Sequence, residues 1–340
     1  MKNLTTKCDP PSPCFGTAGK WQASDHLANA ARCARSSRMS PARRSSTAEG
    51  GRVTLAAPKP PAASKRSGDG SEGGRRPRAG FTLVELLTVI GIIAILAAML
   101  VPVLAAAKKH AQRVQAQLQC QDIANAILKY DSDYGRFPVS TNAQIAASAG
   151  NYDYTYGWTF QTPAGPYQVL PFAGYGGNVV SNAEVIAILM DLTNYPNGQP
   201  VLANVNHQKN PQQTIFLNAK MSSYDPSQPG LPEGGVDVTG VYRDPWGNPY
   251  VISMDLNYDE YCKDSFYCLN KVSSASGNNN NPGLNGLVNP DATQSDNFQY
   301  HGKVMVWSAG PDGKIDPTAT LSGLGSANSG ANKDNVLSWQ

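Results

Sequence analysis

The chain has 340 residues and a formal net charge of +3, with 16% charged residues, so it is long enough to form a folded core. The charge is divided unevenly. Residues 1–80 contain 15 Lys and Arg against 5 Asp and Glu, whereas residues 81–340 contain 13 against 20. The basic part has no apolar periodicity, so we expect it to be disordered. It does not interleave aromatic with basic residues, so nucleic acid is not an expected partner.

An apolar run without charged residues follows the basic part. It covers 22 residues, 86–107, and a helix needs ~20 apolar residues to cross a bilayer. Basic residues flank both ends, but the longer basic stretch precedes the run. The positive-inside rule therefore predicts a single-pass inner-membrane protein with a cytoplasmic N-terminus and a periplasmic acidic part.

The residues before this run, 78-RAGFTLVELL-87, are arranged unlike a secretory signal peptide. A signal peptide has its small residues after the apolar stretch, whereas Ala79 and Gly80 come before it. Together with Phe81, Thr82, Leu83 and Glu85, they resemble the start of type IV pilin-like proteins. In that family a prepilin peptidase cleaves after the glycine and methylates the new N-terminal Phe. The resemblance implies cleavage and methylation at Gly80/Phe81 and removal of a leader, 1–80.

Glu85 would be costly in the bilayer by ~2.5–3.5 kcal/mol unless it is paired. Cleavage would create an amine on Phe81 with a pKa near ~8. The family resemblance implies that this amine meets Glu85 of a neighbouring subunit in a filament. Pro102 stands where the family has a helix-kinking proline, and it removes one helical hydrogen bond, so we expect a kink or local melting there.

The helix is predicted to continue to residue 134, which makes it ~80 Å long. Gly135 and Pro138 supply its stop signal. Apolar residues after the membrane run form one stripe with spacings of three and four, which should pack on a small domain. The stripe consists of Ala116, Cys120, Ile123, Ile127, Tyr130 and Tyr134. Cys120 is therefore expected to be a buried thiol.

Aromatic residues alternate strictly in 151-NYDYTYGWTF-160, which predicts one strand with an aromatic face. We expect this face to pack inside the protein, and the alternative is a stacking platform for sugar or exported protein. Residues 183–192 predict a short helix and 214–217 a strand.

A turn followed by a strand is predicted at 243-RDPWGNPYVISMDL-256, because Asp244, Pro245 and Gly247 occupy favoured positions of a type I turn. Residues 303–308, KVMVWS, predict another strand. The segment between them, 273–300, is rich in Asn, Ser and Gly and is interpreted as a mobile loop.

The segments DPWGNPY, 307-WSAGPDGKID-316 and 334-DNVLSW-339 resemble the C-terminal domain of the major pseudopilin of type II secretion. This resemblance implies an α+β fold, in which a long transmembrane and filament-core helix, 81–134, packs on a small antiparallel sheet within a globular domain, 135–340. The stretch 140–235 is longer than in short family members.

Major pseudopilins also bind calcium in a C-terminal loop, and calcium prefers 6–8 oxygen ligands. The resemblance therefore implies a calcium site at Asp312, Asp316 and Asp334, with Ser308 as a helper. Gly310 and Gly313 allow the tight turns that such a loop needs. From the residues alone, an Asp-Gly pair is usually a turn.

The six cysteines divide equally at Gly80. Cys8, Cys14 and Cys33 lie in the leader. Cys262 and Cys268 enclose five residues of an exposed-looking loop, where an oxidising periplasm would permit a disulfide, the alternative being two free thiols. The four histidines have no zinc-site spacing, and we find no phosphate loop, nucleophile elbow or paired carboxylates. An enzyme is not expected.

These patterns predict a membrane-anchored major pseudopilin that polymerises with itself into a periplasmic filament for type II secretion. Its partners would be the prepilin peptidase, the inner-membrane assembly platform and minor pseudopilins. A first alternative is a type IV pilus subunit for adhesion, motility or DNA uptake. A second is a membrane-tethered carbohydrate-binding module, for which the aromatic strand is the only support. The leader is longer than is usual in the family, so translation could instead start at Met39 or nearer Arg75.

Overall fold

The computed structural model describes residues 80–171, 178–277, 279 and 282–340. The described residues all lie in one compact unit, Arg78–Gln340. Residues 1–79 of the leader, including Cys8, Cys14, Cys33 and Met39, lie outside the described residues, and so do three positions of the predicted mobile loop.

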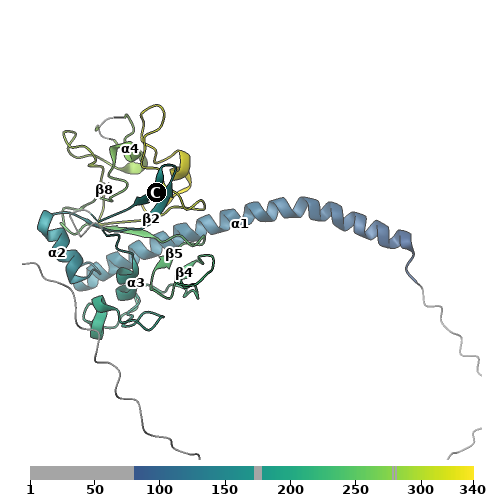
Figure 1. Cartoon of the computed structure of the whole chain (residues 1–340), viewed down its shortest axis with the longest axis horizontal. Coiled ribbons are helices and arrows are strands. Elements are labelled where there is room, and N and C mark those ends of the chain that lie inside the picture. Colours follow the sequence, from purple (N-terminus) through teal and green to yellow (C-terminus); the bar gives the residue numbers. More distant parts are fainter. Residues whose placement is uncertain (1–79, 172–177, 278, 280–281) are drawn as a thin grey trace, which may run out of the picture. The chain divides into compact units, whose positions relative to one another are not determined.

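The first element is a single helix, α1, at Leu83–Tyr134 (Figure 1). It starts two residues later than predicted and ends where predicted, at Gly135, whose backbone is left-handed with φ 64°. The helix continues through Pro102. Local melting, one of the two expectations, is therefore wrong, since α1 is one continuous helix, which Figure 1 draws as a curved ribbon. A kink at Pro102 stays a prediction.

The remaining helices are short. They are α2 (Thr141–Gly150), α3 (Ala183–Leu189) and α4 (Asn270–Ser273), with 3₁₀ turns η1 (Leu202–His207), η2 (Leu284–Gly286) and η3 (Gly330–Asp334). Helix α3 confirms the helix predicted over 183–192, although it ends three residues earlier. The strand predicted at 214–217 is wrong, because those residues have no strand pairing and lie in an irregular segment.

The central sheet has four antiparallel strands in the order β1–β6–β9–β10. They are β1 (Tyr154–Tyr156), β6 (Val251–Met254), β9 (Val304–Ser308) and β10 (Val336–Leu337). Tyr154 pairs with Met254 and Val251 with Trp307. Three two-stranded pairs complete the strands: β2 (Thr159–Thr162) with β3 (Gly165–Gln168), β4 (Gly235–Val236) with β5 (Tyr242–Arg243), and β7 (Tyr261–Cys262) with β8 (Tyr300–His301).

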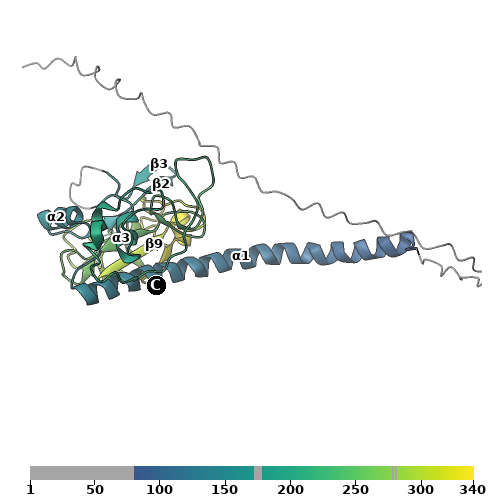
Figure 2. The same ribbon diagram turned by 90° about the horizontal axis from the view of Figure 1, so that it is seen from below.

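Both faces of this sheet are buried, which explains why β6 and β9 have continuous rather than alternating apolar sequences. Side chains of alternate residues point to opposite faces. Ile252 and Val306 belong to one core cluster with the stripe of α1, and Figure 2 shows β9 beside α1. Val251 and Trp307 belong to a second cluster on the other face, with Phe266 and Tyr267.

The predicted stripe of α1 is confirmed, since Ala116, Cys120, Ile123, Ile127 and Tyr130 are fully buried and Tyr134 is half-buried. The predicted α+β fold, a long helix on small antiparallel sheets, is thus the observed one.

Candidate functional site

The segment around Gly80 is the first candidate site, and it lies just before α1. Gly80 and Phe81 precede the helix in exposed, non-helical backbone, and Phe81 is 90% exposed. A Cβ atom at Gly80 would meet no other atom within 4 Å. Packing within the described chain therefore does not require glycine at position 80. Recognition by a processing enzyme would explain why the residue is glycine.

Glu85 takes part in the N-terminal cap of α1. Thr82 is the N-cap residue, and its hydroxyl accepts a hydrogen bond from the Glu85 backbone N–H at 3.3 Å. In return, Glu85 Oε2 accepts from the Thr82 backbone N–H at 2.9 Å and from its hydroxyl at 2.8 Å. This is a capping box, whose signature is Thr and Glu three residues apart. The sequence analysis predicted that Glu85 pairs with the Phe81 amine of a neighbouring subunit and did not predict this capping role.

The apolar run after Glu85 remains exposed in the single chain. The described residues contain one helix, α1, that is long and apolar enough to cross a membrane, and its most apolar window is not buried against the rest of the protein. Large apolar side chains such as Leu87, Ile92 and Leu96 are more than half exposed. A water-soluble monomer would not expose so long an apolar surface, so membrane or other subunits must cover it.

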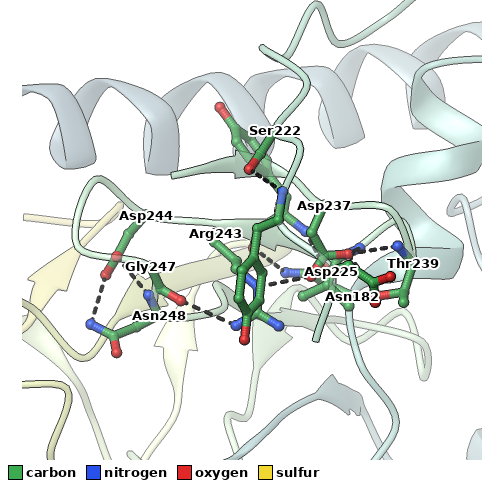
Figure 3. Close-up of polar contacts among 12 residues, drawn as sticks. Asn182, Ser222, Asp225, Asp237, Thr239, Arg243, Asp244, Gly247 and Asn248 are labelled. Atoms are coloured by element: carbon green, nitrogen blue, oxygen red, sulfur yellow. Dashed lines mark hydrogen bonds and ion pairs between the residues drawn. The ribbon is translucent and has the colours of Figure 1, made fainter. Parts of the chain in front are cut away.

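The DPWGNPY segment forms a second candidate site, a polar junction between the β5–β6 turn and the end of β9. The Gly247 N–H donates to Asp244 O at 2.9 Å, which confirms the predicted turn. Asp244 Oδ1 accepts from the N–H groups of Trp246 and Asn248. Figure 3 shows Asp244 and Asn248 in contact. Ser308 Oγ donates to Asp244 Oδ2 at 2.5 Å, and Asn248 Nδ2 donates to Gly310 O at 2.8 Å. Burial raises the pKa of Asp244 to about 6, although these hydrogen bonds act in the opposite direction.

Arg243, next to this junction, is the buried group that sequence reasoning missed. Its side chain is only 4% exposed, and its Nε donates to Asp237 Oδ2 at 2.8 Å (Figure 3). The guanidinium lies 5.2 Å from the ring centre of Trp158 and 5.1 Å from that of Tyr224. A sequence shows no local signal for this arrangement, because its aromatic partners are far away along the chain.

The C-terminal loop brings some of the predicted calcium ligands together and excludes one. Ser308 is unavailable because its hydroxyl donates to Asp244 and accepts from the Gly310 N–H. Asp334 Oδ1 is buried without a hydrogen-bond partner among the described residues. Burial, and next the Asp312 carboxylate, raises the pKa of Asp334, so these two acids lie near each other. Asp316 accepts from the Thr318 N–H and hydroxyl and is half-buried.

The glycines of this loop have the predicted freedom. Gly310 and Gly313 have φ values of 69° and 61°. A Cβ atom at Gly310 would lie 2.3 Å from Asp334 O, so the loop can close only over a glycine. Nevertheless, within the described ranges no group of three or more His, Cys, Asp or Glu side chains is arranged to hold a metal ion.

The structure corrects the interpretation of Cys262 and Cys268. Both thiols are free and buried, so the expected exposed loop and its disulfide are not present. Cys262 lies in the second core cluster because β7 pairs with β8, and Cys268 Sγ is 3.6 Å from Ser265 O. Burial raises the pKa of both thiols, which makes them poor nucleophiles. Cys120 is likewise a buried free thiol, as predicted.

The aromatic strand is not one strand. It breaks near Gly157, so Tyr154 and Tyr156 belong to β1 and Phe160 to β2. The Gly157 N–H donates to Val180 O and Trp158 O accepts from the Val169 N–H, so the chain leaves β6 at this point. A Cβ atom at Gly157 would lie 2.0 Å from Val169 O, so this close approach requires glycine. Tyr154, Tyr156 and Phe160 are at most 3% exposed, so they cannot stack on a sugar. The expectation that the aromatic face packs inside the protein is confirmed for these three side chains, whereas Tyr152 is 45% exposed and Trp158 is half-buried.

The segment predicted as a mobile loop, 273–300, is packed where it is described. Leu287 and Phe298 are buried in the second core cluster, and Asn289 Nδ2 donates to Gln294 O at 3.2 Å. Its Asn-rich composition therefore supplies side-chain hydrogen bonds that replace regular secondary structure.

Comparison with known proteins agrees with the first candidate site. Residues 75–101 match the family model described as the prokaryotic N-terminal methylation motif. No curated protein and no solved structure matches the chain. The motif supports a type IV pilin-like family and implies processing by prepilin peptidase and assembly into pilus-like filaments. The motif and the apolar helix fit a membrane-anchored single-pass protein, and this family is generally non-enzymatic.

Proposed function

We propose that the chain is the major pseudopilin-like subunit of a periplasmic filament that drives type II protein secretion. Cleavage between Gly80 and Phe81 would release the leader, and the exposed apolar part of α1 would pass from the membrane into the filament core. Identical subunits joined head to tail do not close into a ring and therefore form a helical filament.

The contact between the DPWGNPY turn and the WSAGPDG segment is the observation that favours secretion over a pilus. These are the segments that resemble the major pseudopilin, and hydrogen bonds from Ser308 to Asp244 and from Asn248 to Gly310 join them. Pilus subunits more often close the C-terminal loop with a disulfide. Here polar contacts close it, since Asn332 Nδ2 donates to Asp316 O at 2.7 Å and to Ser326 Oγ at 2.9 Å.

The secretion role is tested by blocking cleavage and measuring the exported proteins. A Gly80→Lys strain should lose a set of enzymes from the culture medium and accumulate them in the periplasm. Gly230→Lys is the matched control, because Gly230 is also exposed and its Cβ would meet no atom within 4 Å. An unchanged medium in the Gly80→Lys strain would contradict the secretion role and favour a pilus subunit for adhesion, motility or DNA uptake.

The same proposal includes calcium in the C-terminal loop, held by Asp312 and Asp334 with Asp316. The buried Oδ1 of Asp334, which has no partner in the described part of the chain, and the nearby carboxylate of Asp312 fit a cation. The ion would tie the loop after β9 to the start of β10. Chelation should lower the melting temperature of the purified protein, and Asp334→Ala should remove most of that effect. No shift on chelation would exclude calcium.

A further inference from the structure

The segment 255-DLNYDE-260, which connects β6 to β7, has a second pattern of cation ligands. Asp255, Asn257 and Asp259 have the spacing of the first three ligand positions in D-x-[DN]-x-[DN]-G calcium loops. Glu260 stands where such loops have glycine. The pattern lies outside the C-terminal loop.

The backbone of this segment wraps around its first carboxylate. Asp255 is 1% exposed, and its Oδ1 accepts from the Asp259 N–H at 3.2 Å and its Oδ2 from the Glu260 N–H at 2.9 Å. Tyr258 and Glu260 have left-handed backbones, with φ values of 61° and 68°. Non-glycine residues pay a conformational cost there. By itself this geometry is only a tight turn.

Asp153, from the chain before β1, supplies an independent observation. It is only 4% exposed, and its Oδ2 accepts from the Lys263 N–H at 2.5 Å, but its Oδ1 is buried without a partner among the described residues. Burial first, and also the neighbouring carboxylates of Asp255 and Asp259, raises the pKa of Asp153 to about 8, although the backbone N–H groups of Lys263 and Asn257 act in the opposite direction. Tyr154 pairs with Met254, so Asp153 lies opposite Asp255 at the ends of β1 and β6. The buried Asp153 carboxylate thus adds to the carboxylates of the loop, an arrangement that is costly without a cation.

We propose that Asp153 and the loop 255–259 form a calcium site. Calcium binds carboxylate and amide oxygens in flexible geometry, and this site offers both, the amide oxygen being that of Asn257. In this structure the Asp259 carboxylate accepts from the Tyr261 N–H and the Asn257 amide, so three acidic side chains do not yet converge on one point. Because Asp259 is exposed and Asn257 half-buried, both side chains can turn toward the cation.

This site is separate from the C-terminal loop. The Asp255 N–H donates to Lys303 O at 3.0 Å, so the site lies at the start of β9. Ser308, which leads into the C-terminal loop, is at the end of that five-residue strand. At ~3.3 Å per residue, the start and the end of β9 are about 15 Å apart. A cation at the new site would join the end of β6, the start of β7 and the segment before β1.

The test uses the full chain purified in detergent, with Asp334→Ala present throughout so that the C-terminal loop does not contribute. After removal of metal with a chelator, Ca²⁺ alone is titrated in by calorimetry. We expect one saturable site with a Kd of roughly 10⁻⁴–10⁻³ M, as in extracellular calcium modules. Adding Asp153→Asn or Asp259→Asn should weaken binding at least about tenfold and abolish the rise in melting temperature that Ca²⁺ causes.

Asp225→Asn is the matched control, because the half-buried Asp225 likewise accepts a nearby N–H and hydroxyl, from Ser227, but belongs to another part of the chain. It should leave Ca²⁺ binding unchanged. The proposal is overturned if no saturable binding is found, or if it is unaffected by both variants. If Asp153→Asn does not fold, the exposed Asp259→Asn decides the outcome. Because binding is measured on purified protein, the result is independent of filament assembly and of secretion.

Discussion

Removing the Arg243 side chain should destabilise the domain more than any surface change. In an Arg243→Met variant, Asp237 would stay fully buried, and its Oδ2 would lose the hydrogen bond from Arg243. Breaking one partner of a buried ion pair costs about 3–5 kcal/mol, because the other charge remains buried and uncompensated. The loss of contacts with Trp158 and Tyr224 adds to this. Since whole domains have about 5–15 kcal/mol of stability, the effect should be large.

The assay is denaturant unfolding of the full chain in detergent, followed by tryptophan fluorescence, because Trp158 packs on the guanidinium. Lys303→Met is the control. It removes an ion pair with Asp131 whose lysine side chain is 44% exposed, and such pairs contribute about 0–1 kcal/mol. An Arg243→Met, Asp237→Asn double variant should be more stable than Arg243→Met, since no charge is then buried alone and the amide oxygen still accepts from the Thr239 and Val241 N–H groups. Equal losses for Arg243→Met and Lys303→Met would refute the reasoning.

Three further predictions follow from the structure. Glu85→Gln should keep the capping box but lose the negative charge. If that charge pairs with the Phe81 amine of a neighbouring subunit, both Glu85→Gln and Glu85→Ala should be cleaved yet absent from purified filaments. Normal incorporation of Glu85→Gln would leave Glu85 with the capping role alone. Ile123→Ala should lower the free energy of unfolding by about 2–5 kcal/mol, as measured with denaturant, because Ile123 is fully buried. Leu118→Ala should lower it far less, because Leu118 is 55% exposed. Similar losses for the two variants would contradict the packing of α1. In calcium-free buffer, the free energy of unfolding should rise as the pH falls from about 8 towards 4, because Asp153 and Asp244 bind their protons more tightly in the folded than in the unfolded state. Asp153→Asn should flatten the dependence of the unfolding free energy on pH above about pH 6. If the variant and the wild type have the same dependence, burial does not raise the pKa of Asp153 in the folded protein.

The features that the sequence predicted correctly depend on neighbouring residues. The stripe from Ala116 to Tyr130 follows helical spacing, Gly135 ends α1 because it can adopt a left-handed backbone, and the Asp244–Gly247 turn follows turn chemistry. The apolar run at β9 predicted a strand because it is buried on both faces.

The features that were missed depend on contacts between distant segments. The alternation over 151–160 did not reveal the close approach of Val169 to Gly157 that divides the strand. Cys262 was predicted to be exposed because the residues next to it in the sequence are polar. It is buried because β7 pairs with β8 and the side chain packs in the second core cluster. The role of Asp153 could not be predicted from local sequence, because its partners lie about a hundred residues later. The capping box of Thr82 and Glu85 and the spacing of Asp255, Asn257 and Asp259 were local signals that were overlooked.

The most direct test of the account is the N-terminus of the protein purified from membranes of its native cells. Mass spectrometry of the intact chain and of its N-terminal peptide would determine both the cleavage position and the modification. Processing as proposed predicts a chain that begins at Phe81 with one methyl group on its amine, and a Gly80→Lys variant that keeps the leader. A chain that still carries residues before Gly80, or that is cut after the apolar run, would contradict the account.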